Sequence, residues 1–105
     1  MLKLNFTFTE TCWLWQAENQ VSWHFITVPK NHSEEIKFFA GNNFGKRRGW
    51  GAVRVNVAIG GSKWQTSIFP SKSLDAYMLP IKQAVRNKEQ FGVGDQVKVQ
   101  LKVSI

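Results

Sequence analysis

Alternating apolar and polar residues predict β-strands at both ends of the chain. In the first segment Leu2, Leu4, Phe6 and Phe8 occupy every second position, with polar residues between them. Residues 97–103 repeat the pattern with valine and leucine, leaving lysine and glutamine for the other face. A period of two places successive side chains on opposite faces of a strand. Each segment is therefore expected to bury one face and expose the other.

A hairpin at the centre of the chain carries the clearest signal. Residues 53–59 alternate, Gly60 and Gly61 form a two-residue turn, and a second strand follows. Glycine tolerates the positive φ that such turns need, and a one-residue slip would turn a strand over. Pro70 is expected to break the second strand. The pairs predicted on the apolar side are Ile59 with Ser62, Val57 with Trp64, Val55 with Thr66, and Val53 with Ile68.

Three shorter segments also have strand character. Residues 13–15 and 21–28 are rich in aromatic and β-branched types, which favour strands. A polar turn at residues 18–20 separates these two segments. Residues 76–79 predict a further short strand before Pro80.

Two short helices are expected between the strands. The first spans residues 33–39, where Ser33 can cap the N-terminus and two glutamates suit the positive end of the helix dipole. Glycines from Gly41 onward stop this helix. The second helix opens at Pro80, because the first helical position needs no N–H, and its apolar residues recur at helical spacing.

These elements predict a mainly β protein, a small closed antiparallel β-barrel of six to seven strands with two short helices. Closure is favoured because a flat open sheet would leave two edges to protect. A chain of 105 residues is expected to form a single domain, 1–105. No apolar run approaches the roughly 20 residues that a membrane-spanning helix needs, so no membrane association is expected.

Several runs of residues, spread in order along the chain, match one known family. They are residues 23–29 (WHFITVP), 51–55 (GAVRV), 59–61 (IGG), 64–70 (WQTSIFP), 79–86 (LPIKQAVR) and 94–95 (GD). Together they resemble the bacterial domain-of-unknown-function family 1905. The resemblance covers nearly the whole chain and implies a small closed barrel, near the double-split barrels of AbrB- and MazE-type transcription regulators. It implies no activity, and fold kinship does not transfer DNA binding. Those regulators are swapped dimers of shorter chains, whereas this chain is long enough to close a barrel alone.

The charge is uneven along the chain. The formal net charge is +7, and residues 46–105 hold eleven basic residues against three acidic ones. A basic half attracts polyanions such as nucleic acid, although solubility alone also explains it. No stretch of eight residues is densely basic, so no single segment stands out as the contact surface.

Catalysis finds little support in the residue types present. Cys12 is the only cysteine, and it lies in an apolar stretch where a buried, inert thiol is usual. A lone cysteine also fits a reducing cytoplasm. His24 and His32 are the only histidines, and no spacing resembles a zinc site. The sequence therefore disfavours an enzyme and points to no cofactor or metal.

Three groups of residues are candidate ligand-binding sites. The polar side of the hairpin is one, since arginine and side-chain amides make paired hydrogen bonds to bases or carboxylates; its plainer interpretation is a solvated barrel exterior. A ring of cations at a barrel mouth is the second. The third is a set of tryptophans, which either fill the core or form a stacking platform for bases at the rim of the barrel. The candidates are Arg54, Asn56, Lys63, Gln65 and Ser67 on the hairpin, Arg48, Lys82 and Arg86 at the mouth, and Trp15 and Trp50 among the tryptophans.

The exposure of Leu14 decides between the two interpretations of the tryptophans beside it. If Leu14 is core, Trp13 and Trp15 are exposed, because they point to the opposite face. The leading functional hypothesis is a non-catalytic binding module for nucleic acid, acting as a monomer or weak homodimer. The alternatives are a small-molecule or anion-binding barrel, with or without minor enzymatic activity, and a protein-interaction domain with an apolar patch around Trp13 and Trp15.

Overall fold

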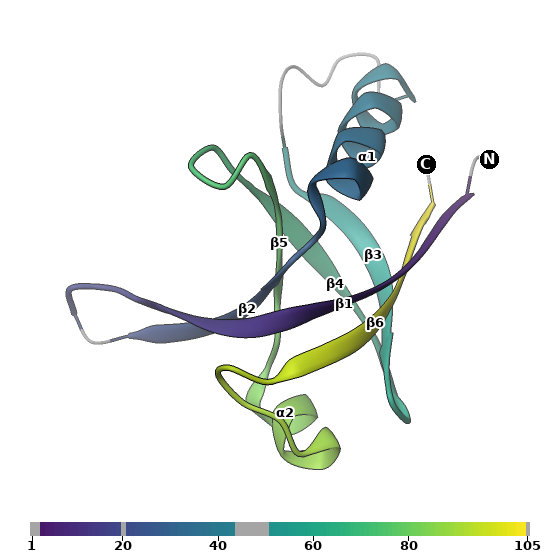
Figure 1. Cartoon of the computed structure of the whole chain (residues 1–105). Helices are drawn as coiled ribbons and strands as arrows, with labels where there is room; N and C mark the ends of the chain where they lie inside the picture. The colour runs from purple at the N-terminus through teal and green to yellow at the C-terminus, as the bar shows by residue number, and fades with distance from the viewer. Residues whose placement is uncertain (1–2, 20, 44–50, 105) are drawn as a thin grey trace.

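A computed structural model describes residues 3–19, 21–43 and 51–104, and Figure 1 shows the arrangement of the elements. Six strands and two helices occupy these residues. In chain order they are β1 (Lys3–Gln16), β2 (Ser22–Thr27), α1 (Lys30–Asn43), β3 (Val53–Ile59), β4 (Ser62–Ser71), β5 (Ala76–Pro80), α2 (Gln83–Glu89) and β6 (Gln96–Ser104). Neither helix of the described residues has the length and apolar character needed to cross a membrane.

The strands close into an antiparallel barrel within one chain, as predicted. Their order around the barrel is β1-β2-β5-β4-β3-β6, and β1 pairs with both β2 and β6. The strand count is six because the two segments expected at residues 2–9 and 13–15 belong to one strand of 14 residues, β1. The first part of β1 pairs with β6 and its last part with β2, so a single strand serves both neighbours.

The central hairpin has the predicted register. Ile59 lies opposite Ser62, Val57 opposite Trp64, and Val53 opposite Ile68. Gly60 has a φ of 57°, which a residue with a side chain adopts only at a cost. Val53, Val55, Val57 and Ile59 are all buried, so the hairpin contributes one complete face to the core.

Apolar side chains fill the interior of the barrel. The largest fully buried ones include residues of four strands: Ile26, Ile68, Tyr77, Leu79 and Leu101. Figure 1 shows α1 at the end of the barrel near the two chain termini and α2 at the opposite end. Both helices add buried apolar residues to the core, Ile36 from α1 and Val85 from α2.

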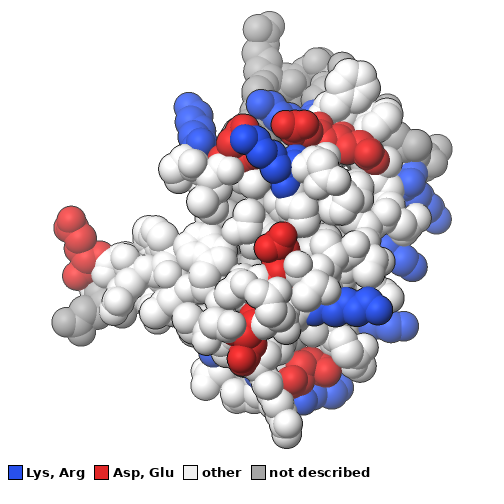
Figure 2. All heavy atoms as spheres, in the orientation of Figure 1, with Lys and Arg blue, Asp and Glu red and all other residues white. Residues whose placement is uncertain are grey.

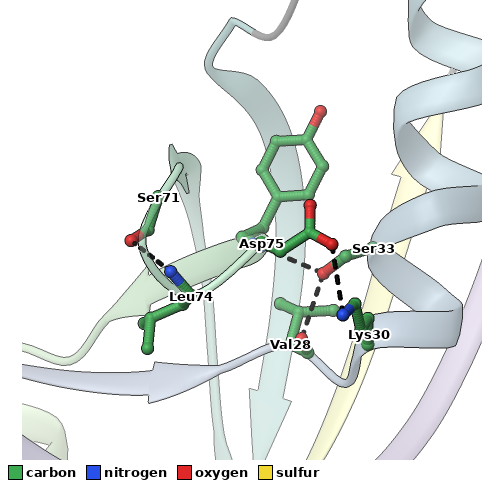
Figure 3. A network of polar contacts seen from close by, with 7 residues as sticks. Val28, Lys30, Ser33, Ser71, Leu74 and Asp75 are labelled. Atoms are coloured by element: carbon green, nitrogen blue, oxygen red, sulfur yellow. Dashed lines mark hydrogen bonds and ion pairs between the residues drawn. The ribbon is translucent and has the colours of Figure 1, made fainter.

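Helix α1 begins earlier and ends later than the sequence predicts. It starts at Lys30, directly after Pro29, and continues through the glycine and asparagines at residues 41–43. Ser33 is therefore not an N-cap, because its own N–H already bonds to the C=O of Pro29. Its buried Oγ instead donates to the Val28 C=O and accepts from the Tyr77 N–H, each at 3.0 Å (Figure 3). The serine ties the helix to β5.

Two prolines also lie in strands, contrary to expectation. Pro80 is the last residue of β5, and α2 begins three residues later at Gln83. Pro70 continues β4 and lies opposite Tyr77 of β5. Because β3 begins opposite Ile68, Pro70 has no β3 partner, and its missing N–H removes no hydrogen bond from that ladder.

The ladder between β4 and β5 is short and leaves the barrel split. It covers only residues 69–71 of β4, whereas β3 pairs with residues 62–68 on the other side. The stretch of β4 from Ser62 to Ile68 thus lacks a strand neighbour on its β5 side. We call the opening between this stretch and residues 80–82 the split.

Candidate functional site

The polar side of the hairpin lies on the outside of the barrel and continues onto β6. Asn56 lies opposite Gln65 of β4 on one side and opposite Lys102 of β6 on the other. The Arg54 guanidinium donates to the Ser67 hydroxyl at 3.4 Å. The structure therefore brings together the hairpin candidates Arg54, Asn56, Lys63, Gln65 and Ser67 on one surface.

Four neighbouring strands form a surface with cations and no carboxylates. The outward positions of β3, β4, β6 and the first half of β1 are otherwise uncharged residues such as Thr7, Asn56 and Gln100. Among the described residues at these positions, none is acidic. Figure 2 shows Lys and Arg side chains in blue along the side where β3 and β6 lie. We call this surface the basic face; its cations are Lys3, Arg54, Lys63, Lys98 and Lys102.

A hollow of about 360 Å³ lies within the basic face. Lys63, Gln65, Gln100 and Lys102 line it together with parts of β3. Amides and ammonium groups thus converge on one concave surface, where an anion would meet donors from three strands.

The lysines of β6 were not among the residues that the sequence singled out. Alternation alone already places Lys98 and Lys102 on the outside of a strand. The missing information was that β6 pairs with β3, 40 or more residues away in the chain. No local pattern contains that pairing, so the basic face appears only when the barrel closes.

The remaining cationic candidates do not join the basic face in one ring. Lys82 is exposed just before α2 and lines the split beside Trp64. Arg86 lies on α2, is half-buried, and has a buried Nε without a hydrogen-bond partner. The Asp95 carboxylate accepts from the Gly92 N–H at 2.8 Å. Arg48 and Trp50 lie outside the described residues.

Neither sequence-based expectation for the tryptophans of β1 describes the structure. Leu14 is 41% exposed and Trp15 is 47% exposed, while Trp13 is half-buried and donates through Nε1 to the Thr27 hydroxyl at 2.9 Å. The reason is that the β1–β2 ribbon extends beyond the barrel, as Figure 1 shows at the left. Both faces of its end meet solvent.

Exposed aromatic side chains gather on the outer face of β1, β2, β5 and the end of β4. Trp23 is 51% exposed, lies opposite Trp15, and stacks on Phe25 with ring centroids 6.4 Å apart. A hollow of about 400 Å³ opens there. We call it the aromatic hollow; its lining is Trp15, Trp23, Phe25, Phe69, Met78 and Pro80.

The cysteine and histidines are placed for packing rather than for nucleophilic chemistry. Cys12 is fully buried, and this burial raises the pKa of its thiol, with Asp95 adding to the rise and Arg86 opposing it. The pKa of His24 is lowered, mainly by desolvation and further by Arg86. His32 of α1 packs against Phe6, with ring centroids 4.6 Å apart and the rings tilted by 39°. A covered, protonated thiol is a poor nucleophile.

Comparison with known families identifies the family of this chain. The model of a family described as domain of unknown function (DUF1905) matches residues 8–101. The chain belongs to the DUF1905 family. This match confirms the resemblance found in the sequence. The closed barrel of the structure agrees with the fold that this resemblance implies. A search of curated proteins finds no match to the chain.

Proposed function

We propose that this DUF1905 domain is a non-catalytic binding module whose basic face contacts the phosphate backbone of a nucleic acid. One observation carries the proposal: outward positions on four adjacent strands hold cations and no carboxylate. Nucleic acids present regularly spaced phosphates, and lysine and arginine that neutralise them release condensed counterions. The side-chain amides between the cations provide additional donors and acceptors.

The filled interior favours a surface site over a closed ligand pocket. Core side chains from every strand occupy the barrel, including the fully buried Ile26, Leu79 and Val99. A small-molecule barrel needs an interior cavity with convergent polar groups. The polar groups converge instead on the outer hollow lined by Lys63 and Lys102.

The first experiment measures how salt changes affinity. Fluorescence anisotropy follows the binding of a labelled oligonucleotide at increasing salt concentration. We expect log affinity to fall linearly with log salt, with a slope of about −0.9 for each phosphate contacted. The double variant Lys63→Gln/Lys102→Gln removes two cations, so its slope is expected to be shallower by roughly 1.8.

The control for this experiment is Lys72→Gln. Lys72 is exposed in the turn between β4 and β5 and lies outside the basic face. Its loss changes net charge without touching the proposed contact surface, so affinity and slope are expected to stay near wild-type values. Absence of binding at low salt, or equal effects of Lys72→Gln and a single Lys102→Gln, would contradict the proposal.

A further inference from the structure

The split exposes backbone groups of β4 beside the basic face. Ile59 and Ser62 flank a two-residue turn and so form a hydrogen-bonded pair. Along the rest of the ladder, non-hydrogen-bonded and hydrogen-bonded pairs alternate. The N–H and C=O groups of Lys63, Gln65 and Ser67 therefore point away from β3 and toward the split. None of these three residues has a partner in the β4–β5 ladder, which covers only residues 69–71 of β4.

Hollows on either side of the split share lining residues. A hollow of about 250 Å³ lies in the split itself, lined by residues that include Trp23, Trp64 and Lys82. Trp23 also lines the aromatic hollow, and Trp64 also lines the hollow of the basic face. The three hollows are thus neighbours along one track, from aromatic side chains at one end to lysines at the other.

Lysines also gather between the split and α2. A further hollow, of about 380 Å³, is lined by Lys63, Lys82 and Lys88 together with Trp64. None of the residues that line this hollow or the one in the split is acidic. The track therefore combines positive charge with the exposed indole rings of Trp15 and Trp23.

This combination matches an unpaired nucleic-acid strand better than a duplex. A single strand offers both phosphates and free base faces, and stacking on aromatic side chains tolerates any base. A duplex keeps its bases stacked on each other and would leave Trp23 unused. Trp23 is 51% exposed, and without a base stacked on it this apolar surface stays in contact with water, which is unfavourable.

We propose that a single-stranded nucleic acid follows this track, with phosphates on the basic face and at the split and with at least one base stacked on Trp23. The inference rests on the proposed function and adds the strandedness of the ligand and the position of its bases. The N–H groups of Lys63 and Gln65, which point away from β3, are positioned to donate to the same backbone where it crosses the split.

The test compares strandedness and an aromatic substitution. Labelled oligothymidylate of about 12 nucleotides, and a duplex of the same length, are titrated against wild type, Trp23→Ala, Trp23→Tyr and Phe38→Ala at one low salt concentration. Phe38 is the matched control, because it is 63% exposed but lies on α1. Circular dichroism and thermal unfolding verify that each variant is folded.

We expect wild type to bind the single strand more tightly than the duplex. Trp23→Ala is expected to weaken single-strand binding by roughly tenfold, Trp23→Tyr to recover most of the loss, and Phe38→Ala to have no effect. Duplex binding should not respond to Trp23→Ala.

Two outcomes overturn the inference and are distinguishable from failure of the proposed function. If single strand and duplex bind equally, and only Lys63→Gln/Lys102→Gln weakens both, the basic face binds nucleic acid but the track does not. If no nucleic acid binds, both proposals fall. A deca-glutamate peptide serves as a third probe: peptide binding that depends on Trp23, without oligonucleotide binding, assigns the split to an acidic extended peptide instead.

Discussion

Ser33 joins three parts of the molecule through one hydroxyl. Its Oγ donates to the Val28 C=O at the end of β2 and accepts from the Tyr77 N–H of β5. Both backbone groups are buried at residues that are themselves within the core. Nearby, Lys30 and Asp75 also link α1 to the turn before β5, at 3.2 Å, but both side chains are exposed (Figure 3). Exposed ion pairs contribute little to stability, so the serine is the stronger link.

Ser33→Ala is expected to destabilise the fold by about 1–3 kcal/mol, because a buried backbone donor and acceptor each lose the serine as partner. Urea unfolding followed by tryptophan fluorescence measures the change. Ser71→Ala is the control, since Ser71 Oγ makes only exposed hydrogen bonds, with Leu74 and Ser73. If the two variants are equally stable, the buried bridge does not stabilise α1 against β5.

At the scale of elements, the carboxylate of Glu89 links α2 to the hairpin turn. Glu89 accepts from the Ser62 hydroxyl at 2.7 Å and from the Gly61 N–H at 3.4 Å. These contacts fasten the turn between β3 and β4 to the C-terminal end of the helix. A side chain on Gly60 would collide with the same carboxylate. The turn and the helix therefore depend on each other.

Gly60→Ala is expected to cost about 1–2 kcal/mol for the positive φ alone, and more because Glu89 must move. Gly61→Ala is a close control: a Cβ there meets nothing within 4 Å, and its φ is not positive. It should change the free energy of unfolding by less than about 0.5 kcal/mol. Equal destabilisation by both substitutions would show that the turn is not constrained at Gly60.

At the scale of the whole molecule, charge and apolar surface are separated around the barrel. The basic face covers β3, β4, β6 and the first half of β1, and the aromatic hollow lies over β2, β5 and the far ends of β1 and β4. The net charge is +7, and clustered cations on one face repel each other. Such repulsion is tolerated where the charges serve binding, so stability and binding should respond in opposite directions when the lysines are removed.

The double variant Lys63→Gln/Lys102→Gln is therefore expected to unfold at a temperature equal to or above that of wild type while binding nucleic acid less well. Raising salt from about 0.05 M to about 0.5 M should raise the unfolding temperature of wild type, because the repulsion is screened, and should raise that of the variant less. Scanning calorimetry measures both. A variant that melts well below wild type would mean that these lysines stabilise the fold.

The strands and their faces were largely predictable, since alternation is a local property. The register from Val53 to Ile68 follows from the two-residue turn and was correct at every pair. The start of α1 was not predictable from Ser33. The helix begins two residues after Val28, whose N–H donates to the Tyr77 C=O of a strand distant in the sequence. Nor could the sequence show that the β1–β2 ribbon, whose β1 strand ends just after Trp15, extends beyond the barrel.

The candidate site was predictable only in part for a similar reason. The hairpin residues Arg54 and Lys63 were recognised as outward facing, and they are. Their neighbours Lys98 and Lys102 come from a strand at the far end of the chain. Lys82 and Trp64 were considered separately, and only the short β4–β5 ladder places them on one opening.

By itself, the sequence determined which residues face inward, where the diglycine turn lies and that the surface carries excess positive charge. These follow from the two-residue period of a strand and from the geometry of a tight turn, which act over a few neighbouring residues. Only the tertiary structure decided which outward faces become neighbours and where a ladder of the closed barrel is short. Closure depends on pairing between distant strands, and the free energy of that pairing is distributed over the whole core rather than encoded near any one lysine.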